Sequence, residues 1–144
     1  MLDRILVAWA GSPTAQKALD AAVSLARRFE AEITAASVAH SPSHAETRED
    51  RDESIEAARA YLEQTFARLR DRAERVGVAV AHTVIEADEP VEAICRFAEE
   101  HGFDLIVVGH HRRRRAGRLL LHGLAERLME ASDTPVLVVP AESA

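Results

Sequence analysis

Cysteine is almost absent from this chain: its 144 residues include one, Cys95. A single thiol excludes an internal disulfide framework and any cysteine-rich zinc or iron–sulfur site. No apolar run approaches the roughly 20 residues that a membrane-spanning helix requires. The amino terminus also lacks the long apolar stretch and small-residue cleavage site of a secretory signal. We therefore expect a cytoplasmic protein without a membrane partner.

Aromatic residues are also scarce, at 4% of the chain. This scarcity argues against a protein that stacks nucleic-acid bases on aromatic side chains. The 18 basic and 24 acidic residues give a net charge of −6, so the molecule as a whole repels polyanions. We expect no nucleic-acid partner, and any basic function must be local.

Hydrophobic residues are plentiful, at 47% of the chain. This fraction excludes a disordered polar protein, and with few aromatics the core must be aliphatic and rich in alanine. The length matches one domain, since domains are typically about 100–150 residues long. The sequence thus predicts a single domain over residues 1–144.

Strand and helix patterns alternate along the chain. Short apolar runs predict strands at residues 5–10, 33–38, 78–85, 105–108 and 136–139. Helical periodicity predicts helices at residues 13–29, 54–75, 90–101 and 119–131. Residues 41–52 are polar and aperiodic, which predicts an irregular connection. Alternating strands and helices imply parallel pairing, hence a Rossmann-like three-layer α/β sandwich with five strands.

Two loops are candidates for a ligand site, because open α/β sheets bind ligands beyond the carboxyl ends of their strands. The loop after the first strand contributes Ala10, Gly11 and Ser12. Gly109 is expected to end the fourth strand, and the loop there contributes Gly109, His110, His111, Arg112 and Arg113. If these two strands are neighbours, the loops share one crevice. We expect Trp9, just before the first loop, to belong to the core.

Three segments of the chain carry a family pattern. They are RILVA at residues 4–8 with Gly11-Ser12, DLIVVG at residues 104–109, and LLLHGLAERL at residues 119–128 running into TPVLVV at residues 134–139. Together they resemble the universal stress protein family over nearly the whole domain, in the same element order. The resemblance implies a sheet ordered 3-2-1-4-5.

The same resemblance implies a homodimer paired through the last strand. That strand carries Val136, Leu137, Val138 and Val139. The apolar run fits this pairing, because an uncovered apolar edge strand is an aggregation hazard unless something pairs with it.

Members of the family that bind ATP resemble one another in a Gly-x-x-Gly, nine residues, Gly-Ser/Thr pattern after the fourth strand. This chain keeps Gly109, but it has Arg112 at the second glycine and His122-Gly123 in place of Gly-Ser. An arginine there adds a side chain where backbone would approach the ligand and penalises a positive φ. Ala10 stands where an acidic residue often precedes the Gly-Ser of the first loop. We therefore expect a degenerate nucleotide loop and no cofactor.

The alternative is that an adenine nucleotide, ATP or AMP, still binds. It would use Gly11, the backbone near Val38, Gly109 and the arginines of the second loop. Arginines supply charge-assisted contacts to phosphate, and the free N–H groups of the last helix attract anions. Slow ATP hydrolysis with Mg²⁺ is a third hypothesis, which lacks an acidic ligand at Ala10 and an identifiable base.

The basic loop, residues 112–118, has an alternative reading as a solvated charged segment. The histidines His110, His111 and His122 are interpreted as polar loop residues rather than a metal or proton-switch site, because no acid or cysteine accompanies them. We expect no metal and no catalytic residue. The sequence thus predicts a dimeric, non-catalytic stress-response module that offers the basic loop to a small anionic ligand or partner.

Overall fold

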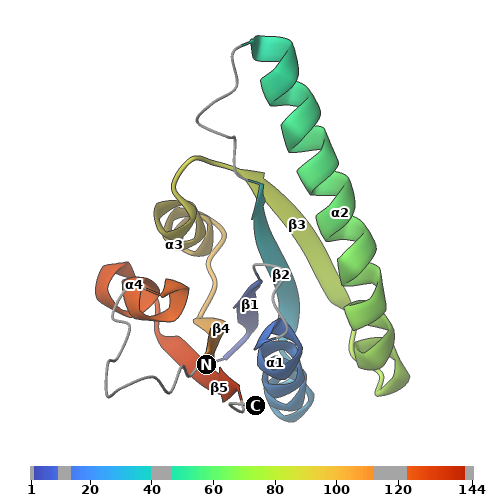
Figure 1. Cartoon of the computed structure of the whole chain (residues 1–144). Helices are drawn as coiled ribbons and strands as arrows, with labels where there is room; N and C mark the ends of the chain where they lie inside the picture. The colour runs from blue at the N-terminus through green and yellow to red at the C-terminus, as the bar shows by residue number, and fades with distance from the viewer. Residues whose placement is uncertain (1, 10–13, 40–46, 112–122, 142–144) are drawn as a thin grey trace, which may run out of the picture.

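The chain folds into one parallel β-sheet between two layers of helices (Figure 1). The structure is a computed structural model, and it describes residues 2–9, 14–39, 47–111 and 123–141. The five strands lie in the order β3-β2-β1-β4-β5, and all neighbouring pairs are parallel. The expected fold class and strand order are therefore confirmed.

In the described ranges, nine elements follow one another in alternation. They are β1 (Arg4–Ala8), α1 (Thr14–Phe29), β2 (Glu32–Ala39), α2 (Arg48–Arg75), β3 (Val80–Glu86), α3 (Pro90–Glu100), β4 (Leu105–His111), α4 (Leu124–Ala131) and β5 (Val136–Ala141). Among these helices, none is long and apolar enough to cross a membrane.

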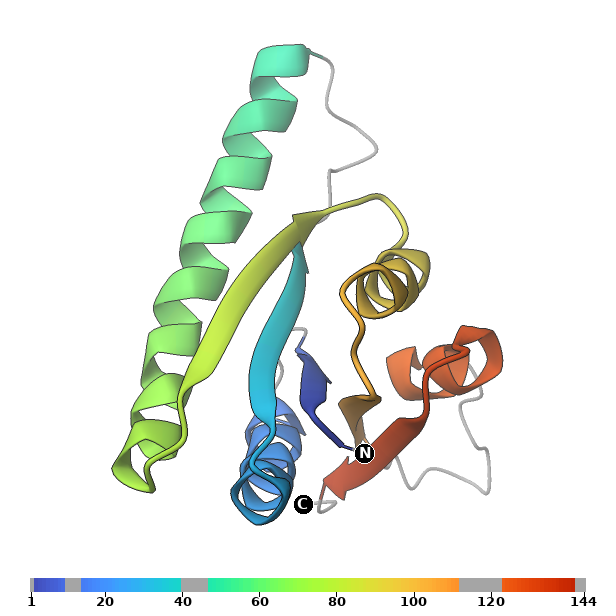
Figure 2. The same ribbon diagram turned by 180° about the vertical axis from the view of Figure 1, so that it is seen from behind.

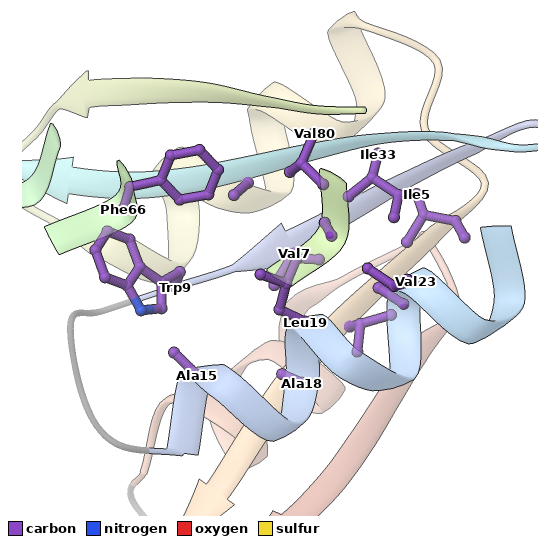
Figure 3. Packing of buried hydrophobic residues seen from close by; sticks show 14 of the residues in the cluster. Ile5, Val7, Trp9, Ala15, Ala18, Leu19, Val23, Ile33, Phe66 and Val80 are labelled. Atoms are coloured by element: carbon purple, nitrogen blue, oxygen red, sulfur yellow. The ribbon is translucent and has the colours of Figure 1, made fainter. Parts of the chain in front are cut away.

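Each face of the sheet has its own hydrophobic core. Helices α1 and α2 cover one face and α3 and α4 the other, as the two opposite views show (Figures 1 and 2). Successive residues of β1 alternate between the cores: Ile5 and Val7 pack under α1, and Leu6 packs toward α3 and α4. Figure 3 shows the first of these cores, in which Trp9 joins the end of β1 to α2. Trp9 is only 3% exposed, which confirms its place in the core.

Helix α2 begins earlier than the sequence pattern predicts. The expected irregular connection, residues 41–52, is wrong for residues 48–52, which are helical. Thr47 caps the helix through its side chain, which accepts from the N–H of Asp50, and Glu49 and Asp50 place negative charge in the first turn. These first turns bury no side chain, so they carry no apolar periodicity that would reveal them.

Two other boundaries differ from the expected ones. Gly109 does not end β4, which continues to His111 because Gly109 pairs with Val139 and His111 with Ala141 of β5. The last helix starts at Leu124 instead of residue 119, with Gly123 as its N-cap; residues 119–122 lie outside the described part. Glycine is typical of strand ends, but here pairing with β5 keeps Gly109 inside the strand.

Asp104 fastens the amino ends of β1 and β4 together. Its Oδ2 accepts hydrogen bonds from the N–H groups of Asp3 and Arg4 at 2.8 and 2.9 Å, and its own N–H donates to the Arg4 carbonyl at 2.9 Å. The backbone hydrogen bonds from Arg4 and Asp3 lower the pKa of Asp104. The carboxylate therefore stays ionised at neutral pH and fixes the register of the two central strands.

Glu30, the residue after the last residue of α1, has a backbone conformation in the left-handed region, with φ of 57°. The N–H of Ala31 donates to the Ala26 carbonyl at 3.1 Å, which is the kind of closing bond that usually follows a glycine at this position. The Glu30 side chain is exposed. A residue with a Cβ stores about 1–2 kcal/mol of strain in this conformation.

We expect E30G to raise the free energy of unfolding by roughly 0.5–1 kcal/mol, because the strain relieved exceeds the chain entropy that a glycine adds. Urea denaturation at neutral pH measures the change. The control E30A removes the same charge but keeps a Cβ, so it should leave stability nearly unchanged. Equal gains in both variants would attribute the effect to charge and contradict the backbone explanation.

Candidate functional site

The carboxyl ends of β1 and β4 lie side by side at the centre of the sheet. Ala8 of β1 pairs with Val108 of β4, and the strand order reverses between these two strands. A ligand crevice in an open α/β sheet lies at such a reversal. The adjacency that the shared-crevice prediction requires is therefore present.

The described residues of the crevice come from three strands and α4. Val38, near the end of β2, is partly buried against the core on the α3 and α4 side, and Gly109 pairs with β5. Six of the predicted site residues lie outside the described part: Ala10, Gly11, Ser12, Arg112, Arg113 and His122. The backbone of His111 belongs to β4, but its side chain is not described.

His110 is a strand residue that contacts a carboxylate, so its interpretation as a loop residue is wrong. It follows Ile106 and Val108 on the β4 face that α3 and α4 cover. Its Nδ1 lies 3.1 Å from Oε1 of Glu126, with 27% of the histidine side chain and 18% of the glutamate side chain exposed. The carboxylate fixes the orientation of the ring, leaving Nε2 as the nitrogen available to a ligand.

Glu126 is the site residue that sequence reasoning missed. It is the third residue after Gly123, the N-cap of α4, which makes no side-chain capping bond. A glutamate at this position is the acidic half of a capping box, and that spacing was the signal available in the sequence. Glu126 Oε2 is buried and accepts no hydrogen bond from the residues described. The carboxylate thus brings negative charge to the positive end of α4.

Gly123 leaves space that the Glu126 carboxylate uses. A Cβ added to Gly123 would lie 2.6 Å from Oε2 of Glu126, so any larger residue there must push the glutamate aside. A histidine and a carboxylate supply a base and its orienting partner but no nucleophile. In the described segments, no cluster of three or more histidine, cysteine, aspartate or glutamate side chains is arranged to hold a metal.

Cys95, the single thiol, lies away from the crevice. It lines a cavity of about 520 Å³ between α3 and α4, together with Val91 and Arg127. Burial raises the pKa of the Cys95 thiol, so the thiol stays protonated at neutral pH. This environment fits a packed residue rather than a nucleophile.

If His110 and Glu126 interact, substitutions at the two positions should have non-additive effects on the free energy of unfolding. We expect E126A to lower the free energy of unfolding by about 1 kcal/mol, because it removes the ring's partner and an acid near the start of α4. In an H110A background the same substitution should cost about 0.5 kcal/mol less. Urea denaturation of the single and double variants measures the coupling.

The control for this cycle is E130A, at the exposed carboxyl end of the same helix. An acid there opposes the helix dipole, so E130A should leave stability unchanged or slightly raise it. A loss in E130A equal to that in E126A, or a coupling of zero, would contradict the pairing.

Comparison with known proteins connects this chain to one family. The sequence profile of the universal stress protein family matches residues 1–140. Universal stress protein MJ0531 of Methanocaldococcus jannaschii is 32% identical over 141 residues, which cover 96% of this chain and 82% of that protein. A universal stress protein family member from Burkholderia pseudomallei has a crystal structure with 33% identity and a TM-score of 0.78, with 97% of each chain covered.

A further solved structure is a universal stress protein in complex with cAMP. It is 26% identical, covers 95% of this chain and 96% of its own, and has a TM-score of 0.74. The shared strand order, the match over residues 1–140 and these relatives agree with one another. The chain belongs to the universal stress protein family.

Proposed function

We propose that this chain is a non-catalytic, dimeric, cytoplasmic stress-response module that offers its basic loop, residues 112–118, to a small anionic ligand or an anionic partner. The observation that carries the proposal is the start of α4. Gly123 caps this helix without a side-chain hydroxyl, at the position where the ATP-binding pattern has serine or threonine. The N–H groups at this helix end attract an anion, but the Glu126 carboxylate beside Gly123 offsets part of that attraction, and one phosphate donor of the usual set is missing.

The arginines of the basic loop could replace, by their charge, the phosphate contacts that a glycine-rich loop makes through its backbone. Arg112 stands at the second glycine of the pattern, and three further arginines follow it. Guanidinium groups bind phosphate and carboxylate through paired N–H donors, whereas a glycine loop binds through close backbone approach. These residues favour a compact anion over a full triphosphate laid along the backbone.

The second candidate is binding of an adenine nucleotide with one phosphate. It is favoured by the relative that was solved in complex with cAMP, at 26% identity. A single phosphate needs fewer donors than a triphosphate, so the loss of the hydroxyl at Gly123 weakens its binding less. Gly109, the backbone near Val38 and the arginines would hold AMP in this alternative.

Dimerisation through β5 is part of the proposal. In the described sheet β5 pairs on one side only, with β4, and Leu137 is 38% exposed on it. An apolar edge strand associates with other strands unless it is covered. Pairing of β5 with a second copy would cover Val136, Leu137, Val138 and Val139.

Replacing the arginine run tests the anion site. We expect titration calorimetry to show no low-micromolar affinity for ATP, and binding of inorganic phosphate that weakens at least about tenfold in the loop variant, because each lost charge-assisted bond contributes about 1.5–3 kcal/mol. The loop variant is R112S/R113S/R114S/R115S. AMP and ADP are titrated in parallel, and AMP binding alone would favour the second candidate.

The matched control changes net charge equally on exposed positions of α2. It is R48S/R51S/R68S/R75S. This variant should keep phosphate binding within about twofold, since solvent and salt screen distant charges. Unchanged binding in the loop variant, or micromolar ATP affinity in the wild type, would contradict the proposal.

A charge on the edge strand tests the dimer. We expect L137E to convert a dimer into a monomer in sedimentation velocity, because two carboxylates would face an apolar strand pair. The control M129E places the same charge on α4, where Met129 is 54% exposed, and should leave the sedimentation coefficient unchanged. A dimer that persists in L137E would place the interface elsewhere.

A further inference from the structure

Helix α2 is weakly attached to the rest of the molecule. Of its 28 residues, three are buried: Leu62, Phe66 and Ala73. Its amino-terminal turns rise past the end of the sheet in both opposite views (Figures 1 and 2). An element with few buried apolar contacts opens at a low free-energy cost compared with the whole domain.

The attachment of α2 centres on a histidine of β3. The His82 ring stacks on the ring of Phe66, with centroids 4.3 Å apart and planes 20° apart. The same histidine makes an edge contact with Trp9, with centroids 5.8 Å apart. Figure 3 shows that Phe66 and Trp9 lie beside each other at the end of the core under α2. Phe66 is 1% exposed, so its position against His82 fixes this part of the helix.

His82 is held in its neutral form by its surroundings. Its Nε2 lies 3.1 Å from the hydroxyl of Ser37 on β2, which is fully buried. The charged groups that face it both come from α2: Glu63 favours the protonated ring and Arg70 opposes it. Arg70 also lies over the Phe66 ring, 5.6 Å from its centroid, so a protonated His82 would place a second cation on that ring.

Burial, more than these charges, lowers the pKa of His82 from its usual value of 6.5. Because the pKa is lower when α2 is attached, acid destabilises the attached state relative to the released one. Well above pH 6.5 the ring is neutral whether α2 is attached or released, and attachment has its full stability. Below that value the solvated ring of the released state binds a proton first, so acid favours release.

We propose that His82 is an acid-sensitive latch, whose protonation releases α2 from the sheet while the core on the α3 and α4 face stays folded. That second core contains no residue of α2, and α2 contacts β3, β2 and α1. Release uncovers Trp9 and Phe66, an aromatic surface that is closed at neutral pH. The protein thereby gains a conformational response to acidification that is separate from its anion crevice.

Hydrogen exchange measured by mass spectrometry, corrected for the intrinsic effect of pH on exchange, tests the latch. In the full wild-type chain we expect protection of α2 amides to fall by up to about tenfold per pH unit below 6.5, since release takes up one proton. Amides of α3 and α4 should keep their protection over the same range. The fluorescence of Trp9, the single tryptophan, should change with the same midpoint.

H82Q is the test variant, because glutamine does not titrate and can still hydrogen bond to Ser37. It should remove the pH dependence of α2 exchange. The matched control is H101Q: His101 also stacks on a phenylalanine, with its ring 4.1 Å from that of Phe97, but it is exposed. This control should keep the wild-type response.

Two outcomes would overturn the latch: the same pH dependence in H82Q as in the wild type, or loss of α3 and α4 protection together with that of α2. Should H82Q fail to fold, the His82 ring signal in the wild type decides by NMR. A ring that titrates without any accompanying change in α2 exchange or Trp9 fluorescence would equally refute the proposal.

Discussion

Burial of both faces of β1 and β4 is the constraint on which the rest of the structure depends. Ile5, Leu6, Val7 and the facing Ile106 and Val107 are at most 1% exposed. Strands without a solvated face need helices on both sides, and parallel pairing requires long crossovers that those helices provide. The strand order reverses between these two strands, and the helices that follow them, α1 and α4, lie on opposite faces of the sheet.

The pattern of apolar side chains predicts most of the fold. The features that it does not predict depend on polar side chains and on backbone pairing. The runs at Ile5 and Leu105 predict central strands because burial demands apolar residues in sequence. The first turns of α2 depend on the Thr47 cap and on charge, which leave no periodicity. Gly109 predicts a strand end, but pairing with β5 keeps it within β4. To predict the contact of His110 with Glu126, one must know both where β4 ends and where α4 begins.

At the start of α4, a departure from the ATP-binding pattern can be compared with the structure. Gly123 supplies no hydroxyl, and the Glu126 carboxylate occupies space that a Cβ at Gly123 would need. The fold retains its helix terminus and its strand reversal, and under the proposed function guanidinium and imidazole groups replace backbone and hydroxyl donors toward a ligand. Fold and family membership thus indicate where a ligand would lie, and the side chains there decide which ligand chemistry is possible.

The position of β1 in the sheet has a consequence for synthesis. Residues 4–8 lie between β2 and β4, and β4 begins 101 residues after β1. At about 5–20 residues per second, a ribosome needs roughly 5–20 s to deliver that second neighbour. During this interval the most apolar strand of the nascent chain has an open edge, so chaperone capture and aggregation compete for it before the domain can close.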